Sequence, residues 1–199
     1  MQDITKQELR QKIKIELSQN KQNFAKWSKL ICQTIINSDF YTKAKIVYAY
    51  MALPDEVDLS DLIDDALCKN KTVFVPKVVP NSNKMIFFDY SKCQFENGSF
   101  GILEPKTNNT NEDLAKDFME ERITGNQTVI FLVPGRVFGE DGERIGRGKG
   151  FYDVYLSDFL KTQKKSVLVA GVCFPIQIGK QVPTTEHDIK MEQIFTCPK

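Results

Sequence analysis

Residues 129–153 read VIFLVPGRVFGEDGERIGRGKGFYD, which joins a wholly apolar segment to the densest group of glycines in the chain. The first five residues are all apolar, as in a strand that a parallel sheet buries on both faces. Six of the eleven glycines follow, interleaved with arginines and Lys149. Glycines allow close approach of the backbone to a ligand, and free N–H groups with positive charge converge on anions. The stretch therefore predicts a strand followed by a phosphate-binding loop.

The segments on either side alternate between helical and strand patterns. The expected elements are helices over 3–37 with a break at 19–23, a strand at 45–50, a helix capped by Asp58, strands at 72–75 (ended by Pro76) and 85–88, a polar connector at 106–111, the strand at 129–133, a helix at 150–160, and strands at 166–172 and 189–195. This order predicts an α/β fold of three layers, with a mostly parallel sheet flanked by helices. Ligands of such sheets bind beyond the carboxyl ends of strands, where the glycine-rich loop begins.

Length and composition limit the possible classes of protein. We expect one domain, residues 1–199, because that length suits a single core. Lysine and arginine total 27 against 26 acidic residues, a balance that argues against a nucleic-acid partner. No apolar run approaches the length of about 20 residues that a membrane helix needs, so we expect no membrane segment, and a cytoplasmic monomer.

The cysteines and the single histidine exclude several kinds of site. Five scattered cysteines form no CxxC pair, which argues against both a zinc site and a disulfide framework, and we expect small core residues instead. His187 lies in a polar segment, so Ser-His and Cys-His nucleophiles are also disfavoured.

Two familiar phosphate motifs do not fit the loop. Walker A requires GxxxxGK[ST], but Glu143 stands at the first glycine position and Gly150 replaces Ser or Thr. The dinucleotide fingerprint GxGxxG fails on spacing, because the glycines stand at 146, 148 and 150.

The loop and four other elements, in order, resemble the 5-formyltetrahydrofolate cyclo-ligase family. The elements are Lys6 and Arg10 as KxxxR, residues 54–58 (PDEVD), residues 100–105 (FGILEP), the loop itself as RxGRGKGxYD, and His187-Asp188. Phe151 departs from the family pattern by replacing a tyrosine, and Leu59 stands where threonine is frequent. Neither change removes a charge, so they affect fine substrate contacts rather than the chemistry.

The resemblance implies a set of roles. The residues expected to bind ATP are Lys6, Arg10, Arg144, Gly146, Arg147, Gly148, Lys149, Gly150 and Tyr152. Those expected to bind the folate are Met51, Glu56, Arg147, Lys149 and Tyr152, and Arg147 and Lys149 are also the expected catalytic residues. Asp153 and Asp188 are expected to hold Mg²⁺, which prefers one or two carboxylates plus phosphate oxygens.

Taken alone, several of these residues have ordinary structural explanations. Lys6 and Arg10 share a helix face and could form a solvated basic surface. Asp153 could favour the positive end of a helix, and Tyr152 could belong to the core. Glu56 and Asp188 could be loop carboxylates. The cations at 144, 147 and 149 are harder to explain so, because a solvated charge run does not need glycines at alternate positions.

The implied reaction converts 5-formyltetrahydrofolate and ATP to 5,10-methenyltetrahydrofolate, ADP and phosphate, through phosphorylation of the formyl oxygen and attack by N10. Two other functions remain open. A sugar-phosphate isomerase or CoA-transferase-like enzyme would bind a phosphorylated ligand without consuming ATP, and a non-catalytic protein would only hold a nucleotide or folate. A nucleic-acid module is disfavoured by the charge balance.

Overall fold

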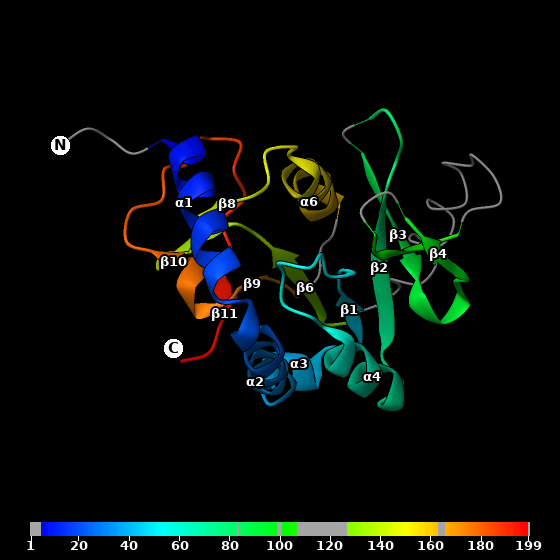
Figure 1. Cartoon of the computed structure of the whole chain (residues 1–199). Coiled ribbons are helices and arrows are strands. Elements are labelled where there is room, and N and C mark those ends of the chain that lie inside the picture. Colours follow the sequence, from blue (N-terminus) through cyan, green and yellow to red (C-terminus); the bar gives the residue numbers. More distant parts are fainter. Residues whose placement is uncertain (1–4, 83, 99–100, 107–126, 163–165, 199) are drawn as a thin grey trace.

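The computed structural model describes residues 5–82, 84–98, 101–106, 127–162 and 166–198 (Figure 1). Asp3, Phe100 and all of the expected connector except Lys106 lie outside these residues. The helices are α1 Lys6–Gln19, α2 Phe24–Ile36, α3 Asp39–Lys43, α4 Ser60–Cys68 and α6 Phe151–Thr162, with 3₁₀ turns at Lys21–Asn23, Tyr90–Lys92 and Pro175–Gln177. The strands are β1 Ile46–Tyr48, β2 Thr72–Val78, β3 Met85–Asp89, β4 Phe95–Asn97, β5 Leu103–Pro105, β6 Val129–Pro134, β7 Val137–Gly139, β8 Arg144–Ile145, β9 Val167–Val172, β10 Ile178–Gly179 and β11 Gln193–Phe195.

The main sheet has six strands in the order β11-β9-β6-β1-β2-β3. Five of them run parallel, and β3 pairs antiparallel with β2 at one edge. β6 lies near the centre, and every one of its residues is buried, as its continuous apolar run predicts. The expectation of a mostly parallel sheet is confirmed.

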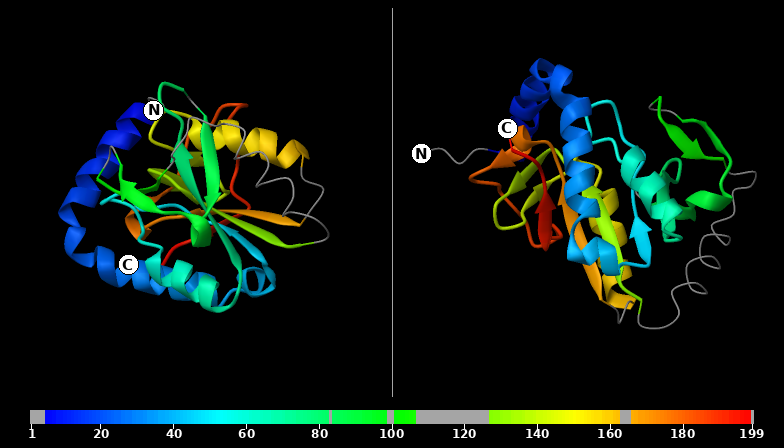
Figure 2. Two further views of the ribbon diagram at one scale, coloured as in Figure 1. Left: turned by 90° about the vertical axis from the view of Figure 1, so that its right-hand side faces the viewer. Right: turned by 90° about the horizontal axis from the view of Figure 1, so that it is seen from below.

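Helices cover both faces of this sheet. Ile130 and Leu132 of β6 pack into one buried cluster with α1, α2 and α4, whereas Phe131 and Val133 pack into a second cluster with α6. Figure 2 shows α6 on one side of the strands and the helices of the amino-terminal half on the other. Alternate residues of a strand point to opposite faces, so a strand in the middle layer must be apolar throughout. The three-layer prediction is confirmed.

The amino-terminal helices follow their local signals. Thr5 and Glu8 form a capping box at the start of α1, because each side chain accepts from the other residue's backbone N–H. The break between α1 and α2 is the 3₁₀ turn Lys21–Asn23, inside the expected interval. The sequence analysis missed α3, a five-residue helix that Ser38 caps by accepting from the Tyr41 N–H.

The expected end of the second strand at Pro76 is wrong. β2 continues to Val78 and pairs with β3 from Phe74 to Val78, including Pro76 opposite Phe87. The Thr72 N–H and the Phe74 carbonyl both bond toward β1, so the nitrogen of Pro76 faces the same side. β1 has ended before that point, and the missing N–H therefore removes no bond between strands.

Two other boundaries differ from expectation, and the glycine-rich stretch contains strands that were not predicted. α4 begins at Ser60 with Leu59 at the N-cap, while Asp58 accepts from the Ser60 N–H one residue outside the expected position. The last strand covers only Gln193–Phe195, because the Met191 N–H bonds to the Gly142 carbonyl instead of to β9. The glycine-rich stretch contains β7 and β8, which join β10 in a three-stranded sheet. Strands of two or three residues leave too little pattern to be seen in a sequence.

The cysteines follow their expected role only in part. Cys32, Cys173 and Cys197 are buried, but Cys68 is exposed and Cys93 is half-buried. Burial raises the pKa of Cys32 to about 12. No helix among the described residues is long and apolar enough to cross a membrane.

Candidate active site

Two loops meet at the carboxyl ends of β1 and β6. These strands are parallel neighbours, with Tyr48 opposite Phe131. The segment that follows β1, residues 49–58, therefore lies beside the segment that follows β6. Arg147 in the second segment contacts Glu56 in the first. The site forms where the chemistry of parallel sheets usually lies.

Glu56 is held in place by its own loop. Its backbone N–H donates to the Leu53 carbonyl at 2.9 Å, and its Oε2 accepts from the Leu53 N–H at 3.1 Å. Tyr50 stabilises the same turn, because its buried hydroxyl donates to the Val57 carbonyl at 3.0 Å. Met51 is half-buried against the adjoining core. A carboxylate with 9% exposure is thus presented on a turn that its neighbours fix.

Arg147 bridges two carboxylates. Its Nε donates to Glu56 Oε1 at 2.9 Å, and its Nη2 donates to Asp55 Oδ1. Asp55 also accepts from Arg136 Nη1 at 2.6 Å. Burial alone would raise the pKa of Asp55, but the hydrogen bonds from Arg136 and Arg147 outweigh it and hold that pKa below its usual value. Asp55 is therefore charged at neutral pH, and the Arg147 side chain stays 35% exposed.

Arg144 lies under the loop rather than on it. Its side chain is 4% exposed, and its Nη2 donates to both oxygens of Asp153 at 2.9 Å. Nη1 donates to the Pro134 carbonyl, and the guanidinium lies 5.8 Å from the centre of the Tyr152 ring. Its Nε is buried and has no hydrogen-bond partner within the described part of the chain. Arg144 thus ties β8 to the first turn of α6, which is a structural role beside the ATP contact expected of it.

Tyr152 belongs largely to the core. Its ring packs edge-on against Phe131 at 6.5 Å. Burial, with a further contribution from Glu56, raises the pKa of its hydroxyl above the usual value. The hydroxyl is consequently neutral at any physiological pH.

The helix α1 carries two cations to the loop. Arg10 Nε donates to the Gly146 carbonyl at 2.8 Å, and Lys6 forms an ion pair with Asp188. Asp188 Oδ2 also accepts from the backbone N–H of Thr185 at 2.6 Å. Burial opposes ionisation of Asp188, but these donors lower its pKa overall. Lys6 and Arg10 lie on one helix face, and that face is turned toward the loop.

The tip of the loop keeps its donors available. Gly148 and Gly150 adopt φ angles of 103° and 70°, which glycine tolerates best. A Cβ on Gly148 would stand 3.8 Å from the Arg10 guanidinium. Lys149 between them is exposed and has no hydrogen-bond or ion-pair partner among the described residues. An exposed cation between two such turns suits an anion that arrives from solvent.

Asp153 lies beside the segment of chain that carries Asp188. The backbone N–H of Ile189, next to Asp188, donates to Asp153 Oδ1 at 3.3 Å. No group of three or more His, Cys, Asp or Glu that could hold a metal occurs in the described part of the chain. Two carboxylates beside a phosphate site fit Mg²⁺, which takes its other ligands from phosphate and water.

The sequence analysis missed two members of this site, Arg136 and Asp55. Both stand inside elements that were singled out, the cationic run and the PDEVD segment, but neither was given a role. The only signal for Asp55 is its place beside Glu56. Arg136 has no local signal, since its partner is 81 residues away.

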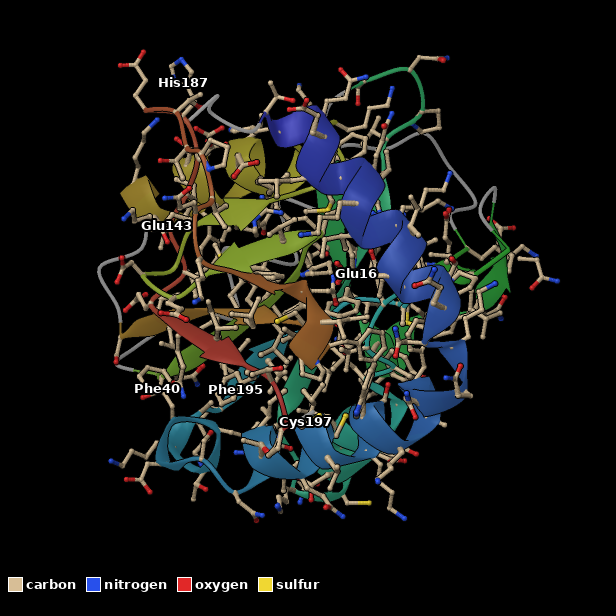
Figure 3. All side chains as sticks on the ribbon, turned by 60° about the vertical axis from the view of Figure 1, so that its left-hand side comes forward. Glu16, Phe40, Glu143, His187, Phe195 and Cys197 are labelled. Atoms are coloured by element: carbon tan, nitrogen blue, oxygen red, sulfur yellow. The ribbon has the colours of Figure 1, made fainter. Side chains whose placement is uncertain are left out.

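Some features lie away from the site. His187 projects into solvent with 87% of its side chain exposed (Figure 3). Two shallow hollows of about 490 and 320 Å³ lie beside β10 and β11, and none of the predicted site residues lines them.

Comparison with family models gives a match over almost the whole chain. Residues 2–197 match the model of the 5-formyltetrahydrofolate cyclo-ligase family. The chain belongs to this family. Among its curated relatives, the mouse 5-formyltetrahydrofolate cyclo-ligase is 32% identical over 84% of this chain and 81% of its own length. The Haemophilus influenzae 5-formyltetrahydrofolate cyclo-ligase is 27% identical over 92% of this chain and 91% of its own length.

Solved structures agree on the fold of this family member. The NMR structure of the 5,10-methenyltetrahydrofolate synthetase from Aquifex aeolicus matches with a TM-score of 0.68 and 27% identity, over 97% of this chain and 90% of that protein. The synthetase from Mycoplasma pneumoniae matches with a TM-score of 0.66 and 20% identity, over 97% and 99%.

Proposed function

We propose that this cyclo-ligase uses ATP to convert 5-formyltetrahydrofolate to 5,10-methenyltetrahydrofolate, with release of ADP and phosphate. The observation that supports it best is the contact of Arg147 with Glu56, because it joins the expected phosphate loop to the expected folate carboxylate at 2.9 Å. Two binding sites that share a side chain can bring a phosphate of ATP against a group on the folate.

The chemistry explains why the site consists of cations and not of a nucleophile. A formyl group on nitrogen is a poor electrophile, and its oxygen is a poor leaving group. The formyl oxygen attacks the γ-phosphorus, and the bond from that phosphorus to ADP breaks. N10 then attacks the activated carbon, its proton passes to solvent, and the carbon–oxygen bond breaks to release phosphate. Both steps move negative charge between oxygens, which fixed cations stabilise.

Each part of the site has a proposed task. Lys149 and Arg147 stabilise the charge on the transferred phosphoryl group, and Glu56 with Met51 orients the folate. Lys6 and Arg10 hold the outer phosphates from above the loop. The glycines at 146, 148 and 150 bring backbone N–H groups to the same phosphates. Tyr152 shapes the wall between the two substrates.

Asp153 and Asp188 are the proposed magnesium ligands. A Mg²⁺ ion held there would neutralise charge on the β- and γ-phosphates. Lys6 pairs with Asp188 and Arg144 pairs with Asp153, so the two proposed ligands stand beside two of the proposed ATP-binding cations.

One assay tests the reaction. The protein is mixed with Mg-ATP and 5-formyltetrahydrofolate, and the near-ultraviolet absorbance of the methenyl product is followed together with ADP release. We expect product and ADP in equal amounts. Binding of both ligands without product would favour a non-catalytic binding protein, and product without ATP consumption would contradict the proposed mechanism. The expected monomer and cytoplasmic location stay predictions, which light scattering and cell fractionation can test.

A further inference from the structure

Arg136 holds an unusual place behind the site. It stands two residues after the end of β6, and its side chain is only 12% exposed. Its backbone is fixed on both sides, because its N–H donates to the Ile145 carbonyl at 2.7 Å and its carbonyl accepts from the Gln177 side chain at 3.2 Å. Gln177 is itself buried, with 2% exposure. Arg136 is thus a cation whose backbone is held in place by hydrogen bonds on both sides.

The charge of Arg136 is directed at one oxygen of Asp55. Arg136 Nη1 donates a hydrogen bond to Asp55 Oδ2 at 2.6 Å, while Arg147 Nη2 donates to Asp55 Oδ1. The two arginines and the two carboxylates, Asp55 and Glu56, form a chain in which positive and negative groups alternate and the net charge is zero. Arg147 lies between Asp55 and Glu56 in this chain and is the most exposed member of the four.

Two consequences follow from this arrangement. Arg147 is gripped at both Nε and Nη2, so the plane of its guanidinium is set before any substrate arrives. Its Nη1 keeps both N–H groups for a ligand, since no described residue accepts from it. Without Arg136, however, Asp55 and Glu56 would share the single positive charge of Arg147, which leaves one net negative charge behind the proposed phosphate site. Asp55 could then also rotate away from Arg147.

We propose that Arg136 is a positioning residue: it neutralises and orients Asp55, so that Asp55 and Glu56 together aim Arg147 at the reacting phosphoryl group without repelling the polyphosphate. This inference rests on the proposed function. It assigns a role to Arg136 and Asp55, and it extends the site to a residue that touches neither substrate.

The test compares kcat and KM for both substrates in the wild type, Arg136→Gln, Arg136→Lys, Asp55→Asn and the double variant Arg136→Gln/Asp55→Asn. Lys69→Gln is the matched control, because it also removes a cation from an ion pair but lies at the end of α4, outside the site. Thermal unfolding of every variant separates misfolding from loss of positioning.

We expect kcat of Arg136→Gln and of Asp55→Asn to fall about ten- to hundred-fold, since small displacements of a catalytic group have effects of this size. The KM for ATP should rise in Arg136→Gln, which leaves Asp55 uncompensated, and should not rise in Asp55→Asn. The double variant should be no slower than the slower single variant, because both substitutions break one pathway. Arg136→Lys should recover most of the loss.

A purely structural role predicts a different result. It would lower the melting temperature of Arg136→Gln and leave kcat per folded molecule unchanged, or the two losses would multiply in the double variant; either result overturns the proposal. If Arg136→Gln does not fold, Asp55→Asn decides, because wild-type kcat in that variant leaves Arg136 nothing to act through. An inactive wild type contradicts the proposed function itself, whereas an active wild type with unaffected variants contradicts only this inference.

Discussion

The two ends of the main sheet use ion pairs in different ways. At the carboxyl ends of the strands, Arg136, Arg147 and Lys6 pair with acids that stand 81 to 182 residues away in sequence. At the amino ends, Lys69 pairs with Asp65 four residues away, and Lys71 donates to the carbonyls of Tyr41, Thr42 and Ala44 at the end of α3.

From this difference we expect the distant pairs to serve function and the local pairs to serve stability. The distant pairs bring cations from several segments to one place, where an anionic ligand could exchange partners with them. At the amino ends, Lys71 completes the hydrogen bonding of carbonyls at a helix terminus, and Lys69 pairs within its own helix turn. Substitutions at the first end should therefore change turnover, and substitutions at the second should change the free energy of unfolding.

The strongest effect is expected at Lys149. Lys149→Ala should lower kcat by roughly 10²–10³-fold, as loss of one preorganised donor does elsewhere. Its melting temperature should match that of the wild type, because the side chain is exposed and unpaired among the described residues. Absorbance of the methenyl product measures the rate, and Lys69→Ala is the control. A near-normal rate would remove Lys149 from the catalytic role.

The next effect concerns the folate. Glu56→Gln keeps the shape of the side chain but loses the charge that pairs with Arg147. We expect the KM for 5-formyltetrahydrofolate to rise about ten- to hundred-fold, the range for a hydrogen bond to a charged group. Steady-state kinetics at saturating ATP measure it. If the KM for ATP rises instead, Glu56 serves the nucleotide.

At the opposite end of the sheet, Lys71→Met should act on stability alone. It keeps the apolar stem and removes three hydrogen bonds to carbonyls. We expect a loss of about 1–3 kcal/mol in the free energy of unfolding, with kcat per folded molecule unchanged. Urea denaturation and the product assay measure the two quantities. A fall in kcat at full stability would show that the two ends are coupled.

The smallest effect is the acid dependence of stability that Asp188 contributes. Its pKa is lower in the folded protein than the ordinary 3.8, so the folded state binds fewer protons. The contribution of the Lys6 pair is therefore complete above pH 3.8 and disappears as the pH falls through the lowered pKa. We expect about 1 kcal/mol or less, as for partly exposed pairs.

Urea midpoints measured from about pH 2.5 to about pH 6 test this dependence, because that interval includes the ordinary pKa of an aspartate, about 3.9. Asp188→Asn should flatten the acid limb of the curve. An unchanged slope would mean that Lys6 and Asp188 do not pair in solution.

Local patterns were enough to predict most of the fold. β6 and β9 appear as apolar runs because both faces of a central strand are covered, and α2 shows its buried face at helical spacing. β7, β8 and α3 were missed because two to five residues repeat either pattern too few times for it to be recognised. The end of β2 was misplaced because the effect of Pro76 depends on where β1 ends.

The residues of the site also fall into those that local patterns predict and those that they do not. Glycines and cations within residues 144–150 mark a phosphate loop without any knowledge of the fold, and the family motifs add Lys6, Arg10 and Glu56. The burial of Arg144, the bridge from Arg147 to Asp55 and the place of Arg136 behind it have no local signal.

Residue types and their spacing along the chain thus account for the apolar middle layer and the α/β order, and they predict that one loop binds anions, because hydrophobic burial and backbone freedom act over a few residues. The choice of partners for the loop's cations required the folded chain. β1 and β6 pair only in the tertiary structure, and that pairing brings Glu56 and Asp55 beside Arg147 and Arg136. Charge interactions fall off with distance in space, so their pattern follows the fold and not the sequence separation.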